Sequence, residues 1–186
     1  DMICVYPDIP ITETAFYALA QLLYTEAGKN ADKLLTLLGK EELLKQAITM
    51  LHQFLILYPE NPIVDEVSFA LANAYIDLED FETVIHRVKR FQQRYPQSQY
   101  LSGYQYIEAY ANFELERYDD ALALCKTVAT SKYPDRQGRL VESDHKDLAI
   151  YIMGQIYHSL GQPEQAIAEY EKVQGLFPDA KETLEY

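Results

Sequence analysis

Apolar residues recur at three- and four-residue spacing along most of the chain, which is the period of amphipathic helices. The periodic stretches come in pairs separated by short polar turns, so each pair predicts a helical hairpin. One pair covers about 64–78 and 81–95. The last pair lies within 147–177, and Gly161 and Pro163 between its helices supply a helix stop and a first-turn proline.

An aromatic residue followed by proline recurs along the chain. The five copies are Tyr6-Pro7, Tyr58-Pro59, Tyr95-Pro96, Tyr133-Pro134 and Phe177-Pro178. Because proline cannot continue a helix, each copy marks the end of the second helix of a hairpin. Successive prolines are 52, 37, 38 and 44 residues apart, which indicates a repeating unit of about 34 to 38 residues with two inserts.

These junctions predict one continuous array that is a piece of a longer protein. The first repeat is expected to hold an extra helix at about 31–38, with Gly39 as its stop. The predicted organisation is a single solenoid over 1–186, with the tail of a preceding repeat at 1–7, repeats at 11–59, 62–96, 98–134 and 147–178, a loop insert at 135–147, and the start of a following helix at 179–186.

The last unit resembles the tetratricopeptide repeat (TPR). The residues at the family's spacing are Met153, Gly154, Tyr157, Gly161, Ala166, Tyr170 and Pro178. The other units match less fully, through small residues such as Ala72, Ala109 and Ala121. The resemblance implies an all-α fold, a right-handed α-solenoid of stacked antiparallel helical hairpins that forms a TPR-like superhelix.

The Tyr-Pro junctions are similar to the repeat variant of bacterial cell-envelope proteins, such as the outer-membrane assembly lipoprotein and the Tol-Pal coordinator. The segment 151–157 after the second insert also resembles repeat regions of some large bacterial α2-macroglobulin-like proteins. These resemblances imply the bacterial periplasm or cell envelope as the compartment and leave the cytoplasm open.

The first helices of the units carry an aromatic residue four positions before a hydrogen-bonding residue, and such a pair projects from one side of a helix. The resemblance implies that this side is a concave face that binds a peptide. Alternatively, the aromatic residues fill space between adjacent helices. The candidate ligand-binding residues are Tyr17, Gln21, Tyr24, Phe69, Asn73, Ile76, Asp77, Tyr104, Glu108, Asn112, Tyr151, Gln155 and His158.

Charge narrows the choice of partner. The chain has 16 Lys and Arg against 29 Asp and Glu, a net charge of −13, which argues against nucleic acid or an anionic membrane surface. The candidate face holds no Lys or Arg, so it should favour an apolar, neutral or basic protein segment over an acidic tail. The second helix of one hairpin is basic. This helix is either a docking patch for an acidic partner or a solvated helix end. Its basic residues are His86, Arg87, Lys89, Arg90 and Arg94.

No catalytic, metal or cofactor site emerges. Asp144, His145 and Asp147 in the second insert lack a fourth ligand, and no apolar run is long enough to span a membrane. The predicted function is therefore a non-enzymatic protein–protein interaction scaffold, with flanking repeats of the parent chain as neighbours. The alternatives are a structural spacer or self-association module in a larger envelope protein, and a non-catalytic part of a larger enzyme or protease-inhibitor-like protein.

Overall fold

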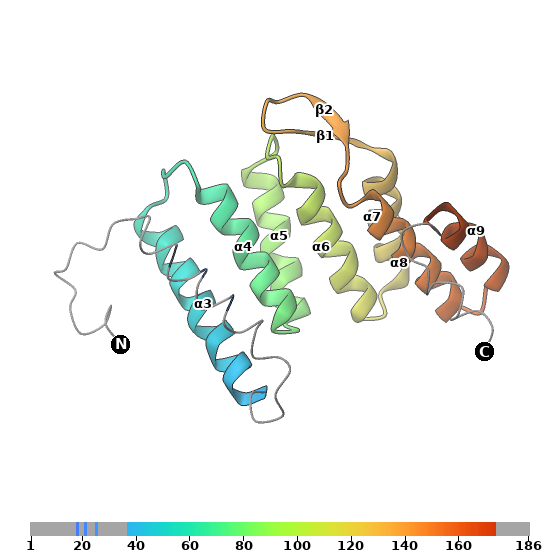
Figure 1. Ribbon diagram of the computed structural model, residues 1–186, viewed down its shortest axis with the longest axis horizontal. Helices are drawn as coiled ribbons and strands as arrows, with labels where there is room; N and C mark the ends of the chain where they lie inside the picture. Colours follow the sequence, from blue (N-terminus) through green and yellow to red (C-terminus); the bar gives the residue numbers. More distant parts are fainter. Residues whose placement is uncertain (1–17, 19–20, 22–24, 26–36, 174–186) are drawn as a thin grey trace. The chain divides into compact units, whose positions relative to one another are not determined.

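The computed structural model describes residues 18, 21, 25 and 37–173 of the chain. Helices dominate this part (Figure 1). In chain order the elements are α3 (Leu37–Leu57), α4 (Val64–Asp77), α5 (Phe81–Arg94), α6 (Leu101–Glu114), α7 (Tyr118–Thr130), β1 (Lys132–Pro134), β2 (Leu140–Glu142), α8 (Lys146–Ser159) and α9 (Pro163–Val173). The predicted flanking segments 1–7 and 179–186 lie outside the described residues.

Contacts divide the chain into two compact units, unit 1 at 1–78 and unit 2 at 79–186, where the sequence predicts one continuous solenoid. The division falls in the turn between α4 and α5, inside the predicted repeat 62–96. In repeat proteins each element contacts only its neighbours, so few contacts hold distant parts of the chain together.

In unit 1, α3 packs against α4 around buried Leu51, Phe54 and Leu71, and His52 Nε2 lies 3.0 Å from the Tyr75 hydroxyl. The predicted helix stop at Gly39 is wrong, because α3 begins at Leu37 and runs through it. The residues that follow are strong helix formers, and the pair Glu41–Lys45 supports the first turns. Residues 31–36 of the predicted extra helix lie outside the described residues.

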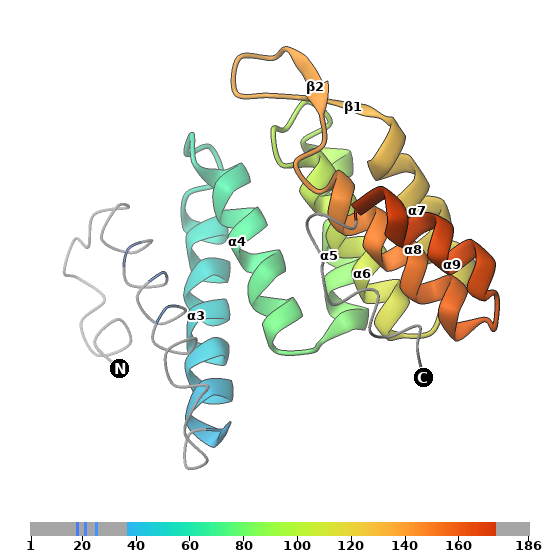
Figure 2. The same cartoon turned by 45° about the vertical axis from the view of Figure 1, so that its right-hand side comes forward.

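In unit 2, successive helices are neighbours from α5 to α9 (Figures 1 and 2). Their core includes Ala109, Ala121, Cys125, Ile152 and Ile156, all buried. Small residues at the helix crossings let the backbones approach closely. Ala166 of α9 is likewise fully buried, as expected for a crossing position.

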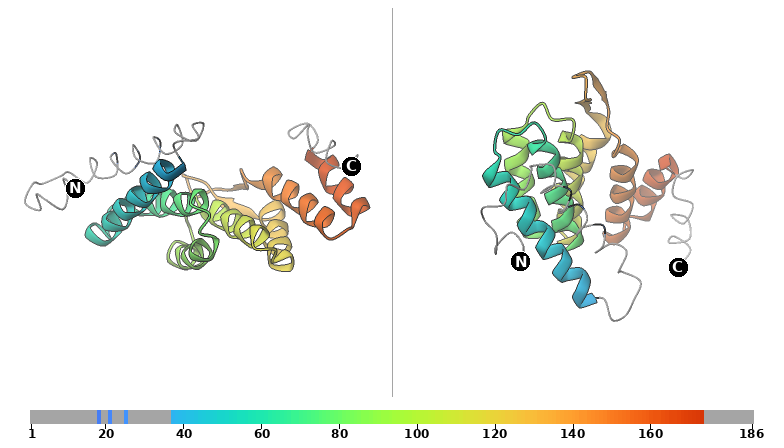
Figure 3. Two further views of the ribbon diagram at one scale, coloured as in Figure 1. Left: turned by 90° about the horizontal axis from the view of Figure 1, so that it is seen from below. Right: turned by 60° about the vertical axis from the view of Figure 1, so that its left-hand side comes forward.

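The insert between α7 and α8 contains a β-hairpin that the sequence analysis did not predict. Strand β1 pairs antiparallel with β2, so that Tyr133 lies opposite Val141. The β-hairpin projects beyond the ends of the helices of unit 2 (Figure 3), and β1 keeps it in contact with α6. The sequence signal that could have revealed it is the turn-forming stretch from Asp135 to Gly138, which is flanked by Tyr133 on one side and Val141 on the other.

The tightest helix crossing predicts a stability effect. A Cβ atom added to Gly154 of α8 would lie well inside van der Waals contact with the Tyr170 ring of α9, whereas one added to Gly39 would meet no atom within 4 Å. We expect Gly154→Ala to lower the free energy of unfolding by about 1 to 3 kcal/mol through overpacking. Gly39→Ala should leave it unchanged or raise it by about 0.5 to 1 kcal/mol.

Urea denaturation followed by circular dichroism measures both variants. Because the two substitutions are chemically identical, their difference isolates the crossing. Equal midpoints for Gly154→Ala and Gly39→Ala would contradict the close approach of α8 and α9.

Candidate functional site

The first helices of the hairpins are α4, α6 and α8. They can be compared position by position, because each is followed by a turn residue with positive φ at the same place. Glu79, Glu116 and Gly161 have φ of 60°, 58° and 68°. Each comes directly after a leucine C-cap, and all three helices have 14 residues. The repeats are therefore in register when α6 is shifted by 37 residues from α4, and α8 by 45 residues from α6.

This register changes which aromatic residue of α6 is equivalent to Phe69 of α4 and Tyr151 of α8. The sequence analysis took Tyr104 as that residue. The counterpart of Phe69 and Tyr151 is Tyr106, whereas Tyr104 lies two residues too early. Tyr104 has no exposed surface, and its ring packs against Phe91 of α5 with 5.7 Å between centroids. Phe69, Tyr106 and Tyr151 are all half-buried, so part of each ring is accessible to a ligand.

The hydrogen-bonding residue that follows four positions later changes in the same way. The counterpart of Asn73 and Gln155 is Tyr110, not Glu108, which is only 7% exposed. Asn112 is also buried, and its side-chain amide donates to the Glu108 carbonyl at 2.8 Å. Glu108 and Asn112 therefore belong to the packing of α6 and present almost no surface.

Glu108 takes the position that Leu71 and Met153 occupy in the other first helices, which is a core position. A carboxylate there needs partners, since an unpaired buried charge is costly. Gln92 Nε2 of α5 donates to Glu108 Oε2 at 2.7 Å, and Lys89 Nζ lies 3.5 Å from Oε1. Glu108 thus joins α5 to α6 in place of an apolar contact.

The sequence alone was misleading here because Tyr104 and Glu108 also form an aromatic–polar pair four residues apart. The buried small residue in the middle of each first helix is the better guide to the register. Ala72, Ala109 and Gly154 are all buried and fall at the observed spacing of 37 and 45 residues. Aligning these three first would have identified Tyr106 and Tyr110 as the equivalent residues.

We call Tyr106, Tyr110, Tyr151, Gln155 and His158 the tyrosine face of unit 2. Tyr106 and Tyr110 of α6 are equivalent in position to Tyr151 and Gln155 of α8, and the two helices are in contact. His158 lies one turn after Gln155 on α8. His158 is exposed and the other four are half-buried.

Neighbouring rings support the three tyrosines from behind. The Tyr106 ring stacks on His145 with 5.1 Å between centroids and 27° between planes. The Tyr151 ring packs on Tyr170 at 5.5 Å. Tyr110 contacts Phe81 edge to face at 6.2 Å. The tyrosine face is therefore built from rings whose positions are fixed by packing.

The phenols of Tyr106 and Tyr110 stay neutral at physiological pH. Burial raises the pKa of Tyr106 to about 12. The pKa of Tyr110 is also raised to about 12, by burial first and then by a hydrogen bond to Glu114. A neutral phenol can donate a hydrogen bond and can also offer its ring to a cation.

Unit 1 carries the corresponding positions of α4. Phe69, Asn73 and Ile76 are half-buried and Asp77 is exposed. The Asn73 side chain donates to the Phe69 carbonyl at 2.9 Å, which leaves its amide oxygen as an acceptor. Gln21 is an exposed helical residue. The remaining two candidates, outside the described residues, are Tyr17 and Tyr24.

Metal binding, membrane insertion and thiol chemistry find no support among the described residues. No group of His, Cys, Asp or Glu among them could hold a metal ion, and no helix in the described part is long and apolar enough to cross a membrane. Burial raises the pKa of Cys125 to about 12, so its thiol is unreactive. On α5, Lys89, Arg90 and Arg94 are exposed, while Arg87 is half-buried.

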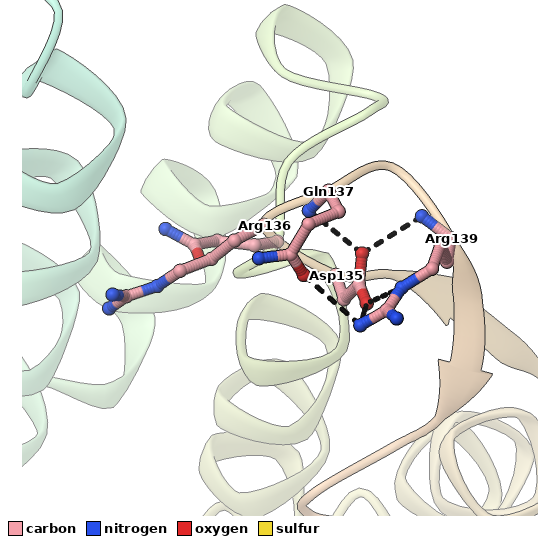
Figure 4. Close-up of polar contacts among 5 residues, drawn as sticks. Asp135, Arg136, Gln137 and Arg139 are labelled. Atoms are coloured by element: carbon pink, nitrogen blue, oxygen red, sulfur yellow. Dashed lines mark hydrogen bonds and ion pairs between the residues drawn. The ribbon is translucent and has the colours of Figure 1, made fainter.

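The carboxylate of Asp135 holds the turn of the β-hairpin between β1 and β2 (Figure 4). Asp135 Oδ1 accepts hydrogen bonds from the backbone N–H groups of Gln137 at 2.8 Å and Arg139 at 2.9 Å. Its Oδ2 accepts from Arg139 Nε at 2.7 Å. Burial alone would raise the pKa of Asp135, but these hydrogen bonds outweigh it and lower the pKa. Arg136 Nε donates to Gln99 in the α5–α6 loop at 3.0 Å.

Comparison with known proteins agrees with this geometry. Residues 149–179 match the family model of the tetratricopeptide repeat, a range that covers α8 from Ala149 onward, its left-handed turn and α9. The chain has the fold of a tetratricopeptide-repeat protein. The all-α fold class of stacked helical hairpins predicted from the sequence is thereby confirmed.

Solved TPR structures resemble the chain over most of its length. A MamA crystal structure is 20% identical and covers 89% of this chain and 73% of its own, with a TM-score of 0.59. Nearly identical TPR-like repeats from Podosopora anserina are 14% identical and cover 90% and 77%, with a TM-score of 0.60. At such identities the likeness shows the fold alone. The chain matches none of the curated proteins with which it was compared.

His145 predicts a pH dependence of stability. Its Nδ1 is buried without a hydrogen-bond partner among the described residues, and burial lowers its pKa below 6.5, with Asp144 offsetting part of the effect. Above about pH 6.5 both folded and unfolded states hold the ring neutral. As the pH falls below that value the unfolded state binds the proton first, so stability is lost.

Melting temperatures between about pH 7.5 and pH 5.5 measure this loss. His145→Phe keeps a ring against Tyr106 but cannot bind a proton, so its melting temperature should fall less than that of the unmodified chain. Parallel curves for the two proteins would show that His145 is not the group responsible.

Proposed function

We propose that this TPR chain is a non-enzymatic scaffold that holds a segment of a partner protein on the tyrosine face of unit 2. The observation that carries the proposal is the set of half-buried rings, Tyr106, Tyr110 and Tyr151, fixed from behind and flanked by the Gln155 amide. Rigid aromatic side chains contribute large contact area at little cost in conformational entropy, which is why they dominate binding surfaces.

The chemistry of the face favours an apolar, neutral or basic segment. Its polar groups are phenols, the Gln155 amide and the His158 ring, and the acidic residue Glu114 lies one turn after Tyr110 on α6. Amides can bond a peptide backbone, and the ring faces attract cations. An acidic tail would meet no Lys or Arg at these positions.

The other functions raised by the sequence stay as alternatives. A spacer or self-association module would need no ligand on the tyrosine face, and a non-catalytic part of a larger enzyme would gain its activity from flanking sequence. Placement in the bacterial cell envelope likewise stays a proposal that rests on the Tyr-Pro junctions.

Peptides selected from a displayed library on the immobilised chain provide a ligand for measurement by fluorescence anisotropy. We expect Tyr110→Ala to weaken the selected peptide by about 2 kcal/mol or more, roughly 30-fold, because a central aromatic is removed. Gln155→Ala should weaken it about fivefold through one lost hydrogen bond.

Gln165→Ala is the matched control, since Gln165 is an exposed amide on α9, away from the face. Each variant is first checked for an unchanged melting curve. If Tyr110→Ala and Gln155→Ala bind as tightly as Gln165→Ala, the peptide does not lie on the tyrosine face.

Glu108→Leu tests the register itself. Restoring the apolar residue of this core position should change the free energy of unfolding by less than about 1.5 kcal/mol in either direction, because Lys89 is exposed and is not left as a buried charge. Peptide affinity should stay within about twofold, since Glu108 presents almost no surface.

The same peptide and the same denaturation assay measure both quantities. A large loss of affinity with an unchanged melting curve would instead support the prediction from the sequence that Glu108 contacts the ligand.

A further inference from the structure

The β-hairpin between α7 and α8 is the second surface on which unit 2 offers unused binding groups. All three residues of β2 are exposed, including two apolar ones, Leu140 at 65% and Val141 at 41%. Strand β1 differs, because Tyr133 and Pro134 are buried. The hairpin is thus anchored through one strand and presents the other.

The outer edge of β2 carries free backbone groups. At the turn, Asp135 N–H donates to the Arg139 carbonyl and Gly138 N–H donates to the Asp135 carbonyl, and Gly138 has φ of 75°. Antiparallel pairs alternate between hydrogen-bonded and non-bonded, so Tyr133 and Val141 are the next bonded pair. The N–H and C=O groups of Leu140 and Glu142 therefore point away from β1.

The opposite edge of the hairpin is closed. Pro134 has no N–H group to offer, and the Tyr133 hydroxyl donates to Gln105 of α6 at 2.6 Å. Within the part of the chain that the structure describes, β2 is therefore the edge of this sheet that can accept another strand.

Several contacts hold this edge in place before any partner arrives. Asp135 locks the turn, Arg136 bonds Gln99 of the α5–α6 loop, and Tyr133 bonds α6. Little conformational entropy remains to be lost on binding, which favours a short ligand.

Charge indicates the direction and the chemistry of the ligand. Arg136 and Arg139 are exposed at the turn (Figure 4), in a chain whose net charge is −13. A strand antiparallel to β2 runs toward the turn, so its carboxyl-terminal end would lie beside these two arginines. Exposed edges are usually protected by charge or proline, whereas Leu140 and Val141 leave this one apolar.

We propose that β2 accepts an extended segment of a partner protein as a third, antiparallel strand, with apolar residues beside Leu140 and Val141 and carboxylates at its end beside Arg136 and Arg139. This is β-augmentation, in which main-chain hydrogen bonds supply affinity and side chains supply selectivity. The surface is separate from the tyrosine face and takes a ligand of the opposite charge.

The probe is a labelled synthetic peptide of alternating Thr and Val that ends in Asp-Glu, measured by anisotropy against the whole chain. A matched peptide ends in Lys-Arg, and a third carries N-methyl groups on the residues that would bond β2. The acidic peptide should bind at least about tenfold more tightly than either of the others, since each loses a charge contact or backbone hydrogen bonds.

Two protein variants test the edge directly. Glu142→Pro removes one outward N–H group and should weaken the acidic peptide about tenfold, whereas Glu142→Thr keeps that group and should stay within about twofold. Tyr110→Ala should bind the acidic peptide like the unmodified chain, so failure of this proposal is distinguishable from failure of the proposed function.

Protection of the Leu140 and Glu142 amides from hydrogen exchange in the complex would support the proposal independently. No binding of the acidic peptide up to millimolar concentration, or equal binding of the N-methylated peptide, would overturn it. Sedimentation showing self-association that Glu142→Pro abolishes would also overturn it, because the edge would then be occupied by a second copy of the chain.

Discussion

The structure of unit 2 depends on how closely the two helices of a hairpin approach at their crossing. At the last crossing the Tyr170 ring occupies the space that a side chain on Gly154 would need. Ala109 and Ala121 are equally free of exposed surface in the preceding hairpin. Once this small position is set, the 3.6-residue period decides which residues face the core and which face the neighbouring first helix.

That constraint explains what the sequence predicted and what it did not. Helix starts and ends followed from turn residues: Gly161 ends α8, and Asp80 caps α5 by accepting from the Thr83 N–H at 3.2 Å. Glu79 and Glu116 also have positive φ, but they could not be recognised as helix ends because glutamate, unlike glycine, does not favour this conformation. The start of α5 and the end of α8 were therefore predictable from turn residues, while the register within α6 was not.

The candidate site was predictable only in part for the same reason. The sequence aligned Tyr151 and Gln155 in the register that α8 shows, because Gly154 is a strong marker of register, and their role in binding stays a prediction. In α6, Ala109 is a weaker marker, since alanine occurs at many helix positions, and two aromatic–polar pairs competed. The hairpin was missed because its strands have three residues each, too short for a period-two pattern to be visible.

Glu108 shows how the same position can serve packing and leave the surface to its neighbours. A leucine or methionine there would complete an apolar core, as Leu71 and Met153 do. The carboxylate instead ties α6 to the basic helix α5 through Gln92 and Lys89, so part of the charge on α5 is used within the protein. On the β-hairpin, Arg139 is likewise paired with Asp135 and Arg136 bonds Gln99, yet both side chains are exposed beside the edge of β2. An acidic ligand of that edge would therefore place charge selectivity on the β-hairpin and leave neutral and apolar contacts to the tyrosine face.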